Sequence, residues 1–282
     1  MRTSPSADER LAERTIADFG EQWTRFTTND GFYASLELLE DICEPLVPVS
    51  AFRDRRVVEI GSGTGRIVQM MLAAGAAHVT ATEPSVAFDV LTSNLAHEGA
   101  RVDCVRTTGD RLPPGLDADL VVAIGVLHHI PDPRPVVEAA FRALRPGGRI
   151  LVWLYGREGN AAYLSLVTPV RALTTRLPPG PTLVLARVLS ALFTGYIALS
   201  RVAPLPLRGY VQHVIGKFTP ERRTEVIYDQ LKPAYAKYYT GAEARALVEA
   251  GGFADVRLHH RHGYSWTVTG VRPADRTPGS VR

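Results

Sequence analysis

The clearest pattern along the chain is an alternation between short apolar runs and longer amphipathic stretches. The short runs are rich in β-branched residues, which favour strands buried on both faces of a sheet. The stretches between them repeat apolar residues every three or four positions, the period of an α-helix. Strands that alternate with helices pair in parallel through right-handed crossovers, so this pattern predicts an open α/β sheet. The five predicted strands occupy residues 57–60, 78–81, 102–105, 119–124 and 149–155.

The segment before the first strand has a helical pattern. One helix is expected over 7–19 and a second over 31–46, where apolar residues fall on one face and prolines end the run. Aromatic residues surround Gly20 between these helices. They either pack on the main domain or form a lid over a ligand, with Gln22 or Trp23 in contact with it.

The alternation stops after the fifth strand. Residues 156–239 are rich in Leu, Ala, Arg and Pro and predict several helices. A capped helix over 240–250 and two strands over 255–259 and 264–271 then complete the sheet as an edge hairpin. We therefore expect an N-terminal helical lid at 1–50, a core at 51–155 and 240–272, a helical insert at 156–239 that caps the site, and a disordered tail at 273–282.

The composition is that of an ordinary globular protein, with 282 residues, 45% hydrophobic and 22% charged. The net charge of +3 is spread along the chain and gives no reason to expect a nucleic acid partner. Cys43 and Cys104 lack the spacing of a structural metal site. The polar N-terminal residues show no secretory signal, so the expectation is a cytoplasmic enzyme.

The most apolar stretch of the insert is 182–200, which is long enough to raise the question of a membrane span. However, its polar residues fall near one helical face, and an amphipathic pattern argues against a span. A helical lobe over the active site is favoured, and a membrane-surface patch is left open as the alternative. The polar residues of this face are Arg187, Ser190, Thr194 and Arg201.

Residues 57–66 join the first predicted strand to the helix that follows it. Glycines stand at every second position after the strand, at Gly61, Gly63 and Gly65. Glycine lets the backbone turn tightly and lie close to a ligand, and the unpaired amides at the helix start point toward that ligand. This arrangement is typical of a nucleotide-type cofactor site at the end of a strand in an α/β sheet.

Two acidic residues follow the next two strands. Glu83 stands 22 residues beyond Gly61, at the tip of the second strand, where a carboxylate can accept hydrogen bonds from a ribose diol. Asp110 follows the third strand. Taken alone, Glu83 also suits a helix N-terminus and Asp110 a turn cap, so each assignment depends on the other features.

Together with these features, three further motifs resemble the class I S-adenosylmethionine-dependent methyltransferase family. They are Phe-Gly-x-Gln-Trp at 19–23, Gly-Val-Leu-His-His-Ile-Pro-Asp-Pro at 125–133 and Leu-Arg-Pro-Gly-Gly at 144–148. The resemblance is strong over 56–155 and moderate over 240–271. It implies a Rossmann-like, mostly parallel seven-stranded sheet with the order 3-2-1-4-5-7-6 and an antiparallel last strand.

The resemblance also implies S-adenosylmethionine as the cofactor and S-adenosylhomocysteine as the product. The diol, exocyclic amine and amino-acid tail of this cofactor match two carboxylates and a run of free amides better than a dinucleotide does. By resemblance, the cofactor-binding residues are Glu59, Gly61, Ser62, Gly63 and Gly65 for the methionine part, Glu83 for the ribose, Asp110 with the backbone of Arg111 for the adenine, and Gly125 beside the methionine end.

The acceptor side of the site offers candidate bases and aromatic walls. His128 and His129 follow the fourth strand, where the acceptor should approach, and histidine suits proton removal near neutral pH. The alternative is that one of the pair packs inward as a core residue. His259 and His260 point to opposite faces of a strand and could not bind one metal ion together. His260 and His262 share a face, but no carboxylate lies near them in the sequence, so no metal site is expected. Candidate substrate-binding residues are Trp23, Tyr155, Tyr239, His262 and Tyr264.

These features predict methyl transfer to a small organic acceptor, as in secondary metabolism or sugar modification. Oxygen is the first choice of acceptor atom, because the histidine pair offers a base. Nitrogen or carbon is the alternative, and the apolar insert keeps a lipid-linked or hydrophobic acceptor open. A non-catalytic S-adenosylmethionine-binding scaffold subunit and a dehydrogenase are weaker alternatives, and a homodimer is left open.

Overall fold

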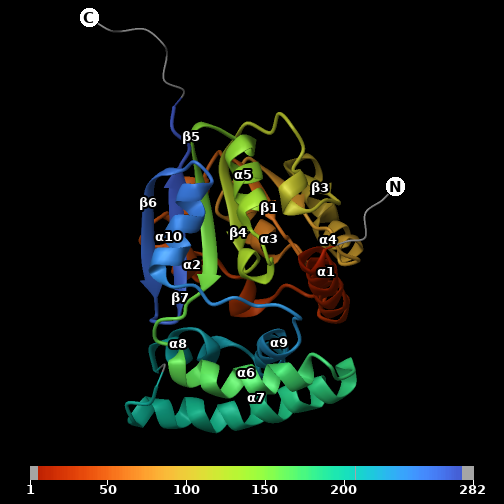
Figure 1. Cartoon of the computed structure of the whole chain (residues 1–282), viewed down its shortest axis with the longest axis vertical. Helices are drawn as coiled ribbons and strands as arrows, with labels where there is room; N and C mark the ends of the chain where they lie inside the picture. The colour runs from red at the N-terminus through yellow and green to blue at the C-terminus, as the bar shows by residue number, and fades with distance from the viewer. Residues whose placement is uncertain (1–5, 207, 275–282) are drawn as a thin grey trace, which may run out of the picture.

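The computed structural model describes residues 6–206 and 208–274, so most of the predicted disordered tail lies outside the described residues. Its centre is one seven-stranded sheet with the order β3-β2-β1-β4-β5-β7-β6 (Figure 1). β7 runs antiparallel to both neighbours, and the other neighbouring strands pair in parallel. The predicted order is confirmed. The strands are β1 (Arg56–Ile60), β2 (His78–Thr82), β3 (Val102–Val105), β4 (Ala118–Ile124), β5 (Leu144–Tyr155), β6 (Ala254–Arg261) and β7 (Ser265–Val271).

Helices cover both faces of the sheet and enclose two apolar cores. In β1, Val57 belongs to one core and Val58 to the other, and each is 1% exposed. A β-branched strand buried on both faces is what a parallel sheet between helical layers requires. One face carries α2 (Leu36–Cys43), α3 (Arg66–Ala73) and α4 (Phe88–Leu95), and the other carries α5 (Arg134–Ala143) and α10 (Gly241–Ala250).

The N-terminal helices differ from the prediction in where they begin and end. α1 (Ala7–Arg25) continues past its predicted end. The stretch 31–46, predicted as one helix, divides into a 3-10 turn, η1 (Gly31–Ala34), and α2. The reason is Ser35, which is extended and accepts a hydrogen bond from the Leu38 amide at 3.2 Å. A serine N-cap of this kind starts a new helix and ends the preceding turn.

The insert folds as a helical lobe beyond the carboxyl ends of the parallel strands (Figure 1). Thr219 caps its last helix by accepting a hydrogen bond from the Arg222 amide at 3.3 Å. The Arg222 guanidinium donates to Asp30 at 2.7 Å and to Glu225 at 2.6 Å, which ties this helix to the N-terminal segment. The lobe helices are α6 (Ala161–Thr174), α7 (Pro179–Val202), α8 (Arg208–His213) and α9 (Pro220–Leu231).

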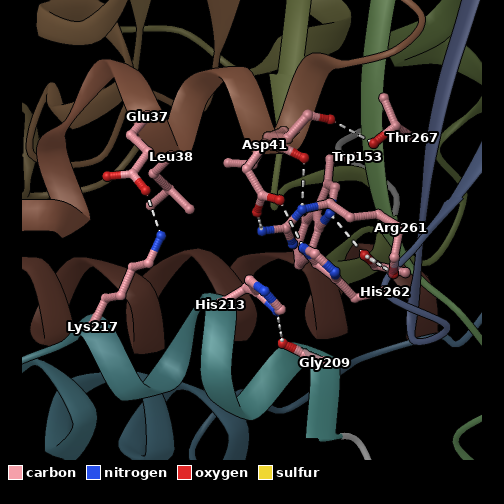
Figure 2. Close-up of polar contacts among 12 residues, drawn as sticks. Glu37, Leu38, Asp41, Trp153, Gly209, His213, Lys217, Arg261, His262 and Thr267 are labelled. Carbon is pink, nitrogen blue, oxygen red and sulfur yellow. Dashed lines mark hydrogen bonds and ion pairs between the residues drawn. The ribbon is translucent and has the colours of Figure 1, made fainter.

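Ion pairs around α2 join the lobe and the sheet edge to the N-terminal part (Figure 2). Lys217 of the lobe pairs with Glu37, and Asp41 pairs with both Arg261 and His262 at the end of β6. Charge-assisted bonds between segments so distant in sequence fix where the lobe sits over the sheet.

Thr240 begins α10 with a capping box. Its Oγ1 accepts a hydrogen bond from the Glu243 amide at 3.2 Å, and the Glu243 carboxylate accepts one from the Thr240 amide at 2.8 Å. Thr240→Ala removes the first bond and should lower the free energy of unfolding by about 1 kcal/mol, measured by urea denaturation. Thr240→Ser keeps the hydroxyl, so its loss in the free energy of unfolding should be less than about half of the loss in Thr240→Ala. An equal loss in both variants would contradict the capping role.

Candidate active site

A cavity of about 700 Å³ lies at the carboxyl ends of the parallel strands. Its walls come from the loops after β1, β2, β3 and β4 and from the lobe helices. In open α/β sheets, ligands bind at this edge, where the strand order reverses, here between β1 and β4. The cavity has a polar end at the glycine loop and an apolar end inside the lobe.

The glycine loop forms one wall of the polar end. Gly61 and Gly63 have φ angles of +71° and +54°, which residues with side chains rarely adopt. A Cβ atom at Gly61 would lie 2.7 Å from Val126, and one at Gly63 would lie 3.2 Å from the indole nitrogen of Trp23. Both positions therefore require glycine for backbone shape and for space. Of the other predicted residues, Ser62 and Gly125 line the cavity and Gly65 is the N-cap of α3.

Glu83 is held rigidly at the tip of β2. Its two carboxylate oxygens accept hydrogen bonds from the backbone amides of Gly63 and Ser85, both at 2.9 Å. The side chain is only 5% exposed, and it lines the cavity. Each carboxylate oxygen keeps a further acceptor site, so Glu83 is placed to receive the two hydroxyl groups of a diol.

Glu59, the penultimate residue of β1, has an incompletely paired carboxyl group. Burial raises the pKa of Glu59 to about 8. Its Oε2 atom and the Oγ atom of Ser62 have no hydrogen-bond partner among the described residues. Buried polar atoms are almost always paired in native proteins, so these two atoms call for a polar ligand group. The ammonium group of an amino-acid tail fits, because it donates hydrogen bonds and carries positive charge.

This geometry predicts that cofactor binding depends on the ionisation of Glu59. With a pKa near 8, the carboxyl is protonated at acidic pH and ionises as the pH rises. An ammonium group prefers the ionised form, so the Kd of S-adenosylhomocysteine should fall by up to about tenfold per unit between about pH 6 and 7.5. Calorimetric titration measures this slope. Glu59→Gln should abolish it, and a slope that persists in this variant would disprove the assignment.

Asp110 and Arg111 lie on a short turn after β3, η4 (Gly109–Arg111). Asp110 lines the cavity, and its side chain is 39% exposed. The Arg111 side chain is 82% exposed, and its amide donates to the Thr108 carbonyl at 3.0 Å. Asp110 is therefore positioned to meet an amine. The Arg111 amide is already used within the turn, which does not support its predicted contact with adenine.

The two histidines after β4 have different environments. His128 is fully buried against the Tyr155 ring, with 3.8 Å between ring centroids, and does not line the cavity. His129 lines the cavity, and its Nδ1 atom lies 2.7 Å from the Tyr235 carbonyl, so Nδ1 carries the proton and Nε2 is the acceptor. Burial lowers the pKa of both rings, to about 3 for His129. Only His129 is therefore placed to meet a ligand.

A polar cluster lies between the two ends of the cavity, and most of its residues are not marked by any sequence motif. Asp229 on α9 accepts hydrogen bonds from the Tyr155 hydroxyl and from the Gln22 side-chain amide, both at 3.2 Å. Gln230 donates to the Tyr155 hydroxyl at 2.6 Å. Burial raises the pKa of Asp229. No local motif marks Asp229 and Gln230, because only the fold brings α9 to the end of β5.

Arg171 and two tyrosines close this polar cluster from the lobe. Arg171 donates from Nε to the Gln230 carbonyl at 2.7 Å and from Nη2 to the Tyr238 hydroxyl at 3.0 Å. The Tyr163 hydroxyl donates to the Gln230 side chain at 2.9 Å. The positive charge of Arg171 favours the ionised form of Asp229, although the effect of burial on that pKa is larger.

The structure brings three of the five predicted substrate-binding residues to the cavity, namely Trp23, Tyr155 and Tyr264. Tyr239 is 2% exposed in an apolar core, and its amide donates to the Tyr155 carbonyl at 2.8 Å. His262 has a positive φ that turns it toward α2, where it pairs with a carboxylate at 2.7 Å (Figure 2). Neither residue reaches the cavity, which corrects these two predictions.

The apolar end of the cavity lies inside the lobe. A site with one polar cluster and long apolar walls suits an acceptor that has a reactive polar group and an apolar body. Among the described residues, no group of His, Cys, Asp and Glu is arranged to hold a metal ion. The apolar walls include Val167, Leu189, Phe193, Val214, Ile215 and Phe218.

Residues 58–150 match the family model described as a methyltransferase domain. The chain is 25% identical over 181 residues to the ubiquinone biosynthesis O-methyltransferase of Idiomarina loihiensis, an alignment that covers 61% of this chain and 74% of that protein. It is 33% identical over 129 residues to the protein of the same name from Aromatoleum aromaticum, covering 45% of this chain. That alignment spans 54% of the second relative, about half its length.

Among solved structures, the chain resembles the 1,6-didemethyltoxoflavin-N1-methyltransferase of Burkholderia thailandensis with bound 1,6-didemethyltoxoflavin and S-adenosylhomocysteine. The TM-score is 0.53 at 15% identity, and the match covers 97% of this chain and 93% of that one. At this identity the likeness concerns the fold alone. It extends over the lobe as well as the sheet, since nearly the whole chain is matched.

Proposed function

We propose that this chain, a class I S-adenosylmethionine-dependent methyltransferase, transfers the methyl group to an oxygen of a small acceptor with a largely apolar body. The observation that carries this proposal is the polar cluster around Tyr155 and Asp229, which stands between the glycine loop and the apolar end of the cavity. Two relatives are named as O-methyltransferases, which supports oxygen as the acceptor atom.

The residues of the polar end suit the cofactor. Glu83 would hold its ribose, Asp110 its adenine amine, and Glu59 with Ser62 its ammonium group. Bound S-adenosylmethionine supplies a sulfonium methyl group that is already activated. The main task of the protein is therefore to place the acceptor in line with that group, which contributes up to roughly 7–11 kcal/mol.

Three residues of the cavity handle the acceptor. Asp229 and Tyr155 orient its hydroxyl group through hydrogen bonds. The hydroxyl oxygen forms the new bond to the methyl carbon as the carbon–sulfur bond breaks, and the hydroxyl proton moves to Nε2 of His129. Burial lowers the pKa of His129, so its ring is neutral and Nε2 has a free lone pair, although the ring is a weak base. The hydroxyl proton becomes strongly acidic as its oxygen bonds the methyl carbon, so it moves to Nε2 late in the transfer. Phe19 packs edge-on against this ring, at 4.7 Å between centroids, and helps exclude water.

An assay with methyl-labelled S-adenosylmethionine tests this function. Phenols and catechols are offered in pairs, with and without an alkyl chain. We expect methylated oxygen, and a kcat/KM that increases with chain length because the apolar end of the cavity binds the chain. Phe193→Ala should weaken this preference by about tenfold while S-adenosylhomocysteine binding stays unchanged. Methylation confined to amines would overturn the proposal.

A further inference from the structure

The outer face of α7 is an exposed apolar stripe. Among the residues that the structure describes, eight of the ten exposed large hydrophobic side chains lie on α6 and α7. On α7 they recur at spacings of three, four or seven positions, so they share one side of the helix. Large continuous apolar surfaces of this kind mark sites that bind proteins or membranes. The α7 stripe consists of Val184, Val188, Leu192, Leu199 and Val202.

The two sides of α7 have different roles. On the inner side, Leu189 and Phe193 line the cavity, and the Ser190 hydroxyl donates to the Pro220 carbonyl at 3.0 Å, which seats α7 on α9. The stripe lies on the opposite side. α7 is the helix farthest from the sheet, at the end of the molecule (Figure 1). α6, in the same lobe, adds the exposed residues Leu166, Val170 and Leu173.

The part of the lobe that contains α6, α7 and α8 carries charge of one sign. The 62 residues 159–220 contain six Arg or Lys residues and no Asp or Glu. The other 220 residues hold 26 basic and 29 acidic residues, so the net charge of +3 arises in residues 159–220. Arg187 and Arg201 on α7 are exposed outside the stripe, and Arg176 is exposed just after α6. In the described part of the chain, none of these three arginines forms an ion pair.

We propose that the outer face of α7 docks this chain onto an anionic lipid bilayer, with α7 lying in the plane of the surface. The apolar stripe enters the boundary between headgroups and acyl chains, and the exposed arginines of the lobe bind lipid phosphates. A second copy of the chain fits this face poorly. In a symmetric dimer the cationic face meets itself, and it offers no carboxylates to pair with the arginines.

The packing of α7 favours an in-plane position over a span. α7 is the one helix in the described residues long and apolar enough to cross a membrane, with a mean hydropathy of 1.8 in its most apolar window. If α7 crossed the bilayer, its inner side, which includes the buried Ser190 and Ser200, would lose its contacts with the rest of the lobe. Lying in the surface keeps the fold intact. It also places the apolar end of the cavity one helix away from the bilayer.

Flotation of the full chain with vesicles tests the proposal. The wild type should float with vesicles of phosphatidylcholine and phosphatidylglycerol, and less with phosphatidylcholine alone. Val188→Asp combined with Leu192→Asp should lower the vesicle partition coefficient by about tenfold or more, because two apolar side chains leave the interface. Val86→Asp is the matched control, since Val86 is exposed but lies outside the lobe, and it should float like the wild type.

Charge is tested separately. Arg187→Gln and Arg201→Gln should each weaken partition onto the anionic vesicles by about fivefold. Arg142→Gln on α5 removes the same charge outside the lobe and should have little effect. Circular dichroism and S-adenosylhomocysteine binding check that every variant is folded.

Two results would overturn the docking proposal. One is a flotation result: either the wild type does not float with the vesicles, or the aspartate variant floats as well as the wild type. The other is a dimer, seen by light scattering, that Val188→Asp dissociates while the wild type fails to bind vesicles, because the face then belongs to a second copy. Flotation is measured without any acceptor. Its failure therefore leaves the proposed methyl transfer standing, and failure of the acceptor assay leaves the docking surface standing.

Discussion

His129→Ala is expected to lower kcat by about 100-fold or more, while the Kd of S-adenosylhomocysteine changes by less than about threefold. The ring lines the cavity, and its Nδ1–H is held by the Tyr235 carbonyl, so Nε2 is aimed at the acceptor side. Removing it leaves the acceptor hydroxyl without a proton acceptor but leaves the glycine loop intact. Single-turnover kinetics with saturating cofactor separate this loss from effects on binding.

Three comparisons make the His129 prediction specific. His129→Gln keeps polarity without a base and should be as impaired as the alanine variant. His97→Ala changes an exposed histidine and should retain full activity. His128→Ala should chiefly lower thermal stability, because this ring is fully buried against the Tyr155 ring. Full turnover in His129→Ala would exclude the base assignment.

The pH dependence of the wild type adds a further check on His129. Burial lowers the pKa of this ring to about 3, so it is neutral throughout the range in which an exposed histidine titrates. At saturating cofactor, kcat should therefore show no acid limb near pH 6.5. If kcat does fall below pH 6.5 in the wild type, and this fall is absent in His129→Gln, then water reaches the His129 ring and its pKa is close to that of an exposed histidine.

Glu83→Ala is expected to raise the Kd of S-adenosylmethionine by more than tenfold if one hydroxyl bond is lost, and by about 100-fold or more if both are lost. The carboxylate is placed to accept two hydroxyl hydrogen bonds, and bonds to a charged group contribute about 1.5–3 kcal/mol each. It also holds the amides of Gly63 and Ser85, so its loss loosens the glycine loop. Isothermal titration with cofactor and product measures the change.

A deoxy ligand separates the two roles of Glu83. The 2′-deoxy analogue of S-adenosylhomocysteine should bind the wild type more weakly, yet Glu83→Ala should weaken this analogue less than it weakens the parent compound. Glu138→Ala, an exposed acid on α5, is the control and should bind like the wild type. An affinity unchanged by Glu83→Ala would show that the ribose lies elsewhere.

The sheet and its cofactor edge were predictable because their signals are local. Strand β1 is β-branched, and the glycines that follow it have φ angles that other residues rarely adopt, so Gly61 and Gly63 are marked in the sequence itself. Glu83 and Asp110 sit where strands end, and the carboxyl ends of parallel strands meet at one edge. The strand order, the fold class and the cofactor class were therefore confirmed.

The acceptor side was harder to predict because its contacts join distant segments. Tyr155 meets Asp229 across 74 positions, and Gln22 meets the same carboxylate across 207. No spacing rule links such residues. The two predictions that the structure corrects, Tyr239 and His262, failed for a related reason, since side-chain direction at a bridge or a turn depends on the neighbouring elements.

By itself, the sequence determined the alternating sheet, the glycine turn and the acids that follow it, because hydrophobic period, β-branching and positive φ are local properties. Only the tertiary structure decided that His129 and not His128 faces the cavity, that α9 supplies Asp229, and that one side of α7 is left uncovered. The first two depend on loop and helix packing across the lobe. The third depends on which helix lies outermost, and amphipathic period alone does not set this.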